Sequence, residues 1–226
     1  IITDRISDIL FCPTDTAILN LKNEGIIDSD IKIVKNGDVM QDAAIYYSEK
    51  SKQKSVIISQ LKIKNNGFVL ATIHRQENTD NHERLLGIVS ALNKISKEMT
   101  VIVPIHPRTR KIIERNKIKI YFTMIDPIGY FEMIELLKNC KLVLTDSGGM
   151  QKEAYFFNKY CVTLRDETEW VELIQHGFNK LAGANEQNII DAFNSFTSKP
   201  FRKTIDLYGG GNASVIIRKT LESIIS

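Results

Sequence analysis

The chain is 226 residues long and 43% hydrophobic, so it can bury a substantial core in one large domain, or in one domain and part of another. Lys and Arg number 30 against 27 Asp and Glu, and a net charge of +3 gives no electrostatic argument for a nucleic acid or an anionic membrane as a partner. No apolar run approaches the ~20 residues of a membrane span, and no basic segment before an apolar core marks a signal peptide, so we expect a cytoplasmic protein.

The three cysteines predict neither a disulfide framework nor a zinc site. Cys12, Cys140 and Cys161 lie far apart in the sequence, without any CxxC spacing. We expect each of them to be a small core residue, and the sequence offers no cluster of metal ligands.

Residues 1–66 predict a small α/β segment that leads into a linker. Ile2, Ile6, Ile9 and Leu10 recur at helical spacing, which predicts an amphipathic helix at the start. The pattern then predicts a strand, a helix closed by Gly25, a second strand, a turn and a long helix, over residues 8–13, 14–22, 31–34, 36–38 and 40–64. Residues 48–66 are rich in Lys, Ser, Gln and Asn, which is typical of a surface helix or a linker between two units.

From Phe68 onward, apolar runs alternate with helical patterns. Strands are predicted over residues 67–73, 100–105, 118–124, 141–145, 161–164 and 179–183. Helices are predicted over residues 81–95, 108–115, 130–138, 148–157, 168–176, 186–196 and 215–225. Strands separated by helices of ~10 to 15 residues imply βαβ crossovers, so the sequence predicts an α/β fold with a doubly wound parallel sheet.

Polar residues follow five of these strands at the point where each strand ends. They are residues 74–78 (HRQEN), His106, residues 126–127 (DP), residues 146–149 (DSGG) and residues 165–166 (RD). Any one of them alone is more typical of a hydrogen-bonded structural position. In doubly wound sheets, however, ligands bind outside the carboxyl ends of the strands, and five neighbouring strand ends together predict a binding cleft along this edge.

The stretch LTDSGGMQKEA, residues 144–154, opens a helix on two glycines. Glycine weakens a helix, so Gly148 and Gly149 indicate that a ligand comes close to the backbone there. A helix N-terminus presents unpaired N–H groups and a partial positive charge, which favours a diphosphate, with Ser147 as a cap or a hydroxyl donor. The alternative is a tight strand-to-helix turn with a serine cap. Glu153 either turns back toward paired ribose hydroxyls or is an exposed helix charge.

Several long stretches resemble the non-hydrolysing UDP-N-acetylglucosamine 2-epimerases, in the same order along the chain. They are FCPTDTAILNLKNEGI, NGDVMQDAA, ATIHRQENTDN, DPIGYFEMIELLKNCKLVLTDSGGMQKEA, TLRDETEW and YGGGNAS. Proteins of that family have the two-domain glycosyltransferase-B architecture, and the resemblance implies that this chain corresponds to the C-terminal portion of such a protein. It implies the end of the N-terminal nucleotide-fold domain at residues 1–47, a linker helix at 48–66, the UDP-binding α/β domain at 67–211 and a C-terminal helix that crosses back at 212–226.

The resemblance also implies roles for matching residues. His74, in the HRxEN motif, is similar to the family's active-site histidine. Positions that match the substrate-binding segments are Ile128, Met133, Ser147, Gly148, Gly149 and Glu153. Among them the serine and the glycines match the diphosphate cradle, the glutamate matches the ribose ligand, and the first two lie in the segment that receives uracil. Arg75 and His106 resemble positions that, in bacterial members, reach toward a second, activating nucleotide-sugar.

Members of this family invert the C2 centre of a nucleotide-linked sugar. A base removes the C2 proton, UDP leaves to give a 2-acetamidoglucal, and the proton returns on the other face while UDP adds back. The resemblance therefore predicts an isomerase of polysaccharide biosynthesis that converts UDP-N-acetylglucosamine to UDP-N-acetylmannosamine. It implies a UDP-sugar substrate, no metal, no cofactor, and a homodimer for the full-length protein.

The chain departs from the common family pattern in two motifs. Trp170 replaces the arginine of a TERPE motif, which exchanges a fixed cation for a flat apolar surface and is expected to alter affinity or sugar preference. The resulting TEWVE form resembles the branch that acts on UDP-2,3-diacetamido-2,3-dideoxy-glucuronate, which is the alternative substrate. Lys152 replaces the first carboxylate of SGGxQEE, and we expect it to face solvent.

Family members begin with a full nucleotide-fold domain whose carboxylates do the acid and base work at C2. We therefore expect this 226-residue chain by itself to bind UDP weakly and not to epimerise. Two other classes stay open. One is a glycosyltransferase of the same architecture, which the combination of HRxEN with DSGGxQ argues against, and the other is a non-catalytic UDP-sugar-binding fragment.

Overall fold

The computed structural model describes residues 2–26 and 30–225, which form two compact units. The larger unit is Ser48–Arg202, and the smaller one combines Ile1–Tyr47 with Lys203–Ser226. Helix α3 (Val39–Lys54) runs from the smaller unit into the larger one. The domain boundaries expected from the sequence stay a prediction.

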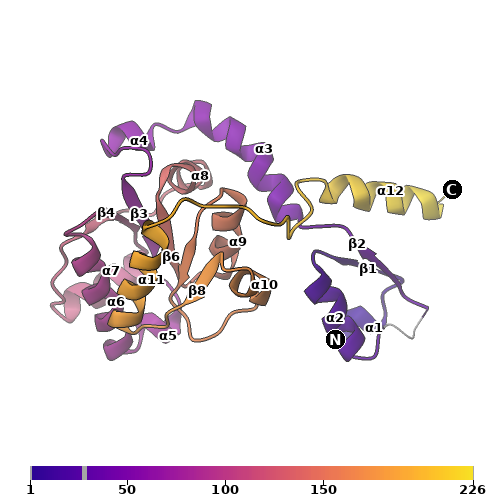
Figure 1. Ribbon diagram of the computed structural model, residues 1–226, viewed down its shortest axis with the longest axis horizontal. Helices are drawn as coiled ribbons and strands as arrows, with labels where there is room; N and C mark the ends of the chain where they lie inside the picture. Colours follow the sequence, from indigo (N-terminus) through magenta and orange to yellow (C-terminus); the bar gives the residue numbers. More distant parts are fainter. Residues whose placement is uncertain (1, 27–29, 226) are drawn as a thin grey trace. The chain divides into compact units, whose positions relative to one another are not determined.

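In the described residues, the larger unit is built on a six-stranded sheet in the order β5-β4-β3-β6-β7-β8, and every strand pair is parallel (Figure 1). Its strands are β3 (Phe68–Thr72), β4 (Thr100–Pro104), β5 (Thr123–Ile125), β6 (Leu142–Thr145), β7 (Cys161–Thr163) and β8 (Asn179–Leu181). The chain moves outward from β3 to β5, returns to β6 beside β3, and then moves outward the other way. The predicted doubly wound α/β class is confirmed, and the strand order reverses between β3 and β6.

Helices flank this sheet on both faces (Figure 1). They are α4 (Ile57–Gln60), α5 (Gln76–Thr79), α6 (His82–Ile95), α7 (Pro107–Arg115), α8 (Tyr130–Asn139), α9 (Gly148–Phe156), α10 (Val171–Gln175) and α11 (Glu186–Thr197). Helices α6 and α11 pack against each other, while α8 packs against α4 and β3, and α9 packs against β6 and β7. From β3 the chain moves along the sheet toward β5, and from β6 it moves in the opposite direction toward β8. Because the crossovers between parallel strands are right-handed, the helices of these two halves cover opposite faces of the sheet.

The alternation of side chains along β3 divides the core between the two faces. All five residues of FVLAT are buried, and Phe68 and Leu70 join one apolar cluster with Leu136, Leu137 and residues of α9. Burial of each such side chain contributes about 1.5–3 kcal/mol, which is why a strand with no polar side is stable here.

Asparagine and serine side chains begin three of the helices that the sequence predicts. Asn81, Ser147 and Asn185 are the N-caps of α6, α9 and α11, and each side-chain oxygen accepts the backbone N–H three residues further on. Each such cap contributes about 1 kcal/mol to helix stability.

The smaller unit pairs two short parallel strands and joins the two ends of the chain. Its elements are α1 (Ile2–Arg5), β1 (Ile9–Cys12), α2 (Asp15–Asn23), β2 (Lys32–Lys35), the start of α3, and α12 (Ala213–Ile225). Gly37 has a φ of +83° and its Cα lies against the Tyr208 carbonyl, where a Cβ would collide. Asp42 caps α12 from α3, since its carboxylate accepts the N–H groups of Ala213 at 3.1 Å and Ser214 at 2.7 Å.

Four elements differ from the sequence-based expectation. The first helix ends at Arg5, and Ile9 and Leu10 belong to β1 because they pair with β2. The helix expected over residues 40–64 is interrupted after Lys54, and residues 76–79 form the unpredicted helix α5. The strand expected over residues 118–124 is reduced to β5, because Asn93 hydrogen-bonds to the backbone of Lys119 and Tyr121 and so replaces a strand ladder there.

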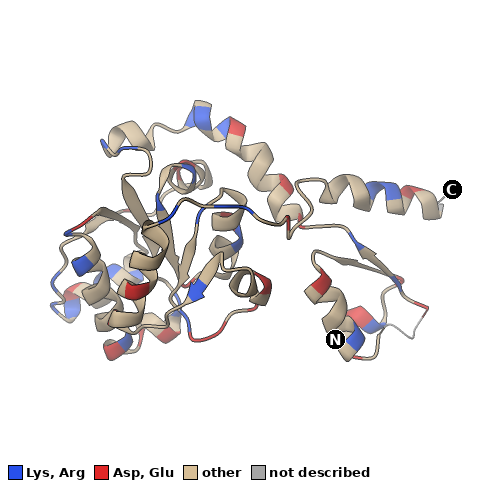
Figure 2. Cartoon of the chain, in the orientation of Figure 1, with Lys and Arg blue, Asp and Glu red and all other residues tan. Residues whose placement is uncertain are grey.

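Basic and acidic residues are mixed over the surface of both units (Figure 2). Around the carboxyl ends of the strands they form ion pairs, which include Arg108 with Asp80 at 2.7 Å and Arg110 with Asp126 at 2.9 Å. Within residues 2–26 and 30–225, no helix combines the length and the hydropathy needed to cross a membrane.

Candidate active site

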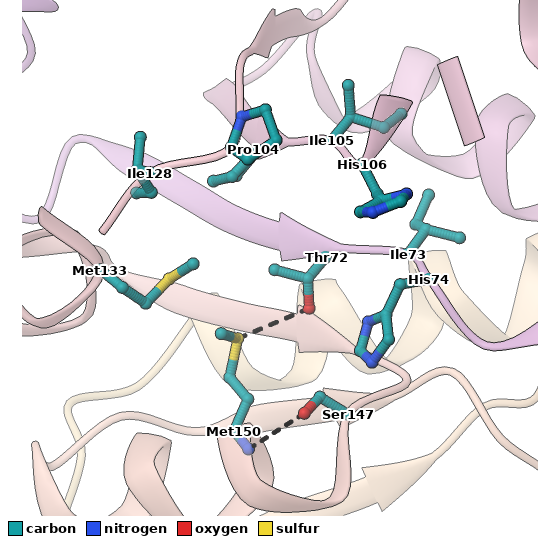
Figure 3. Close-up of a pocket in the computed structure, with 11 residues that line it drawn as sticks. Thr72, Ile73, His74, Pro104, Ile105, His106, Ile128, Met133, Ser147 and Met150 are labelled. Carbon is teal, nitrogen blue, oxygen red and sulfur yellow. Dashed lines mark hydrogen bonds between the residues drawn. The ribbon is translucent and has the colours of Figure 1, made fainter. Parts of the chain in front are cut away.

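A cavity of about 290 Å³ opens at the carboxyl ends of β3, β4 and β6 (Figure 3). The residues that line it are Thr72, Ile73, His74, Pro104, Ile105, His106, Pro127, Ile128, Met133, Ser147 and Met150. The structure therefore brings together His74, His106, Ile128, Met133 and Ser147 from the residues singled out in the sequence. They come from the segments that follow β3, β4, β5 and β6 and from the first turn of α8, at the edge where a doubly wound sheet binds its ligands.

The cavity has a polar end and an apolar end. Figure 3 shows His74 and Ser147 facing each other at one end, with Ile128 and Met133 at the other. Met150 lies between them, and its sulfur accepts a hydrogen bond from Thr72 at 3.5 Å. An elongated ligand with one charged part and one flat, weakly polar part suits such a cavity.

The polar end is formed by the start of α9. Ser147 caps this helix and its Oγ accepts the N–H of Met150 at 3.4 Å, while its own N–H is bonded to Thr145 Oγ1 at 2.9 Å. Gly148 and Gly149 are the first two residues of the helix, so their N–H groups have no partner inside it. These groups and the helix dipole favour an anion at this place.

Asp146 lies immediately before Ser147, and its side chain has no solvent exposure. Residues 74–78 (HRQEN) surround its carboxylate. It accepts the backbone N–H groups of His74 and Arg75, at 3.1 and 3.0 Å, and Asn78 Nδ2 at 3.1 Å. His74 Nδ1 lies 3.1 Å from its other oxygen. Burial raises the pKa of the Asp146 carboxyl, but the hydrogen bonds from His74, Arg75 and Asn78 outweigh burial and hold the pKa below its usual value.

Asn78 ties three strand ends together. Besides Asp146, its Nδ2 donates to the Leu164 carbonyl at 2.9 Å, and its Oδ1 accepts Arg84 Nε at 3.0 Å. The loops after β3, β6 and β7 are therefore held by one buried amide, which explains why an asparagine stands four residues after His74.

Glu153 is partly buried rather than a fully exposed helix charge. Its Oε1 accepts the Tyr130 hydroxyl at 3.2 Å, which links α9 to the first residue of α8. Burial raises the pKa of the Glu153 carboxyl, and the bond from Tyr130 and the charge of Lys152 oppose that rise. Its role as a ribose ligand stays a prediction.

The expectation that Lys152 faces solvent is wrong. Lys152 is only 5% exposed, and its ammonium lies 4.1 Å from the centre of the Trp170 ring. Trp170 in turn donates its indole N–H to the Gly148 carbonyl at 2.9 Å. Lys152 and Trp170, which both depart from the common family pattern, thus contact each other, and Trp170 holds the first glycine of α9 in place.

Replacing Trp170 with Phe is expected to lower the free energy of unfolding by about 0.5–1.5 kcal/mol. The change keeps an aromatic ring beside Lys152 but removes the donor to the Gly148 carbonyl. Chemical denaturation of the two chains measures the difference. Lys152→Met is the matched control, because it removes the cation beside the Trp170 ring and keeps the indole hydrogen bond. If Trp170→Phe were as stable as the parent chain, the indole hydrogen bond would not hold the helix.

Arg75 and His106, the residues expected at an activator site, have structural contacts of their own. Arg75 precedes α5, and its backbone N–H is bonded to Asp146. His106 is the N-cap of α7, and its Nδ1 accepts the N–H of Arg108 at 3.2 Å. Contact with a second nucleotide-sugar stays a prediction for both.

The sequence did not reveal the part that two residues play in this site. Asp146 was recognised only as one of the polar residues at a strand end, and Gln151 not at all. The Gln151 side-chain oxygen accepts the hydroxyls of Thr163 at 3.2 Å and Thr168 at 2.8 Å, which joins α9 to the loop after β7. A polar residue at a buried helical position was the available signal, since Gln151 lies on the side of α9 that faces the sheet.

The family model described as UDP-N-acetylglucosamine 2-epimerase matches residues 1–222. The UDP-2,3-diacetamido-2,3-dideoxy-D-glucuronate 2-epimerase of Pseudomonas aeruginosa is 50% identical over 99% of this chain and 62% of its own length. The UDP-N-acetylglucosamine 2-epimerase of Methanococcus maripaludis is 41% identical over 96% of this chain and 61% of its own length. The chain thus spans about three fifths of the length of these relatives.

Solved structures of this family have the same fold. The crystal structure of Methanocaldococcus jannaschii UDP-GlcNAc 2-epimerase in complex with UDP-GlcNAc and UDP matches with a TM-score of 0.83 at 34% identity, over 97% of this chain and 62% of that one. This likeness extends the confirmed α/β class to the expected glycosyltransferase-B-like architecture. On the family match and these identities, the chain belongs to the UDP-N-acetylglucosamine 2-epimerase family.

Proposed function

We propose that this chain binds the UDP part of UDP-N-acetylglucosamine and serves its conversion to UDP-N-acetylmannosamine. The observation that carries the proposal is the division of one cavity into an apolar end at Ile128 and Met133 and a polar end at Ser147 and the start of α9. Uracil suits the apolar end, and the diphosphate suits the helix N-terminus. The family membership supports the same substrate class.

The roles of the remaining residues follow from this orientation. Ser147 and the N–H groups of Gly148 and Gly149 hold the diphosphate, and Glu153 holds the ribose hydroxyls. His74, beside Ser147, donates a hydrogen bond to the diphosphate as negative charge grows on it (Figure 3). Arg75 and His106 are proposed to contact an activating nucleotide-sugar.

The proposed reaction breaks and re-forms the bond between the sugar and UDP. Removal of the C2 proton and cleavage of the bond from C1 to the diphosphate oxygen give a 2-acetamidoglucal and the UDP anion. The same oxygen then adds back to C1 while a proton reaches the opposite face of C2. The leaving anion is stabilised by donors that are already in place, which lowers the barrier without reorganisation of the site.

Exchange of the C2 proton with solvent tests this proposal. In D₂O, the protein purified from its source organism should introduce deuterium at C2 of UDP-N-acetylglucosamine and form UDP-N-acetylmannosamine. Proton NMR detects both the deuterium incorporation and the new sugar. UDP-2,3-diacetamido-2,3-dideoxy-glucuronate is run in parallel, because the P. aeruginosa relative is named for it. Turnover of that sugar alone would contradict the proposed substrate, and transfer of the sugar to an acceptor would contradict the reaction class.

Ser147→Ala and Glu153→Ala are each expected to weaken UDP binding by about 1–3 kcal/mol, because each removes a hydrogen bond to a charged or polyhydroxyl part of the ligand. Isothermal titration calorimetry with the 226-residue chain measures the change. Glu114→Ala, on the exposed side of α7, is the matched control. Unchanged affinity in either site variant would remove that residue from the binding site.

The homodimer that the family resemblance implies and the cytoplasmic location expected from the sequence stay predictions. Sedimentation velocity of the protein purified from its source organism measures whether it is a homodimer.

A further inference from the structure

We infer that Asp146 is the positioning residue of this site, which fixes the imidazole of His74 so that its Nε2–H faces the cavity and the leaving diphosphate. The inference rests on the proposed function for the identity of the group that His74 meets. Its structural part, the fixed imidazole, concerns only residues of this chain and can be tested without turnover.

The first support is the cost of burying a carboxylate. Asp146 has no solvent exposure, and a buried ionised group is stable only when donors surround it. Its partners are His74, Arg75 and Asn78, all from one short segment. The HRQEN segment thus folds around this carboxylate, and residues 74, 75 and 78 have the spacing that such a fold requires.

The second support is the place of this pair in the sheet. His74 follows β3 and Asp146 follows β6, and the strand order reverses between these two neighbouring strands. The crevice at such a reversal is the usual ligand site of doubly wound sheets. Ser147, the next residue after Asp146, lines the same cavity as His74.

The third support is the orientation of the ring. His74 Nδ1 lies 3.1 Å from Asp146, and the carboxylate can only accept, so Nδ1 carries a proton. The other nitrogen, Nε2, then remains for a ligand in the cavity. The ring is about half exposed, so a ligand can reach it.

The charges around His74 favour its protonated form. The hydrogen bond to Asp146 raises the pKa of His74, while partial burial and the positive charge of Arg75 oppose the rise. His106 lies across the same cavity, from the segment between β4 and α7. A protonated His74 can donate from Nε2 to the diphosphate, which a neutral ring with its proton on Nδ1 cannot do.

The experiment is a pH titration of the four histidines of this chain by imidazole ¹H–¹⁵N NMR, with His74→Gln to identify the His74 signals. In the wild-type chain, neutral His74 is expected to keep its proton on Nδ1. Its midpoint is expected above that of an ordinary histidine. A neutral form with the proton on Nε2, or an ordinary midpoint, would overturn the inference even if Asp146→Asn does not fold.

Asp146→Asn gives the second readout, and Asp191→Asn is its matched control, because Asp191 is exposed and asparagine can still accept the hydrogen bond from Gln187. The midpoint of His74 should fall in Asp146→Asn alone, while the other three histidines keep theirs. In the protein purified from its source organism, Asp146→Asn should lower kcat for C2 exchange on the order of 10²-fold, with a smaller change in KM. A merely structural Asp146 would lower stability and leave the midpoint of His74 unchanged, which contradicts the inference.

The pH dependence of stability gives an independent check on the sign. A raised pKa of His74 in the folded chain contributes stability at pH values below its unfolded pKa, and this contribution is lost as the pH rises through the folded value. The stability difference between the wild-type chain and His74→Gln should therefore shrink over that range. If the titrations agree but UDP does not bind, the proposed function fails and the positioning of His74 stands.

Discussion

Replacement of His74 with Gln is expected to slow C2 exchange in UDP-N-acetylglucosamine by about 10² to 10⁴-fold, the usual contribution of a positioned proton donor. Glutamine fills a similar space and can still donate a hydrogen bond, but it carries no positive charge. The loss should therefore appear mainly in kcat, because the charge matters most when the diphosphate leaves. The rate is measured as deuterium incorporation at C2 of the sugar, with the protein purified from its source organism.

His82→Gln is the matched control for this substitution, since His82 is exposed at the start of α6. Its rate should equal that of the parent protein. If His74→Gln exchanged the C2 proton as fast as the control does, His74 would have no part in expelling the leaving group.

Gly87→Ala is expected to destabilise the chain by about 1–3 kcal/mol, although alanine is the better helix former by about 1 kcal/mol. Gly87 lies in the middle of α6, where this helix meets the loop before α11. A Cβ there would collide with the carbonyl oxygen of Ala184, a backbone atom that cannot turn away as a side chain could. The collision should force α6 and α11 apart.

Thermal unfolding measures this effect, and about 2–4 °C of lost Tm corresponds to 1 kcal/mol for a chain of this size. Glu83→Ala, at an exposed position of the same helix, should change stability by no more than about 0.5 kcal/mol. A Gly87→Ala chain that is more stable than the parent would mean that helix propensity decides at this position and that the close contact does not.

The alternation of apolar runs and helical patterns was enough to predict the larger unit, because a buried parallel strand such as β3 has no polar side that could disguise it. Boundaries failed where side chains compete with the backbone for hydrogen bonds. Asn93 binds the backbone at residues 119–121 and shortens β5, and this contact joins segments 26 to 28 residues apart. A single sequence read by local pattern contains no signal for such a bond.

The candidate site was predictable at the level of strand ends but not of contacts. Chain order places His74 and Ser147 after strands, and the parallel sheet then brings them to one edge. The burial of Asp146 and the ring contact of Lys152 depend on which loops meet in space, so the same polar residue can be an exposed charge or a buried partner. The wrong expectation for Lys152 arose because its ring partner, Trp170, is 18 residues away in the sequence.

The most direct test of the central claim is a titration of the ¹⁵N-labelled 226-residue chain with UDP, followed through the backbone amide signals of Gly148 and Gly149. We expect saturable shifts of both amide signals and of the imidazole signals of His74, because the diphosphate binds at the start of α9 beside that ring. Saturable binding that leaves these signals unchanged and shifts residues elsewhere, or no binding at all, would contradict it.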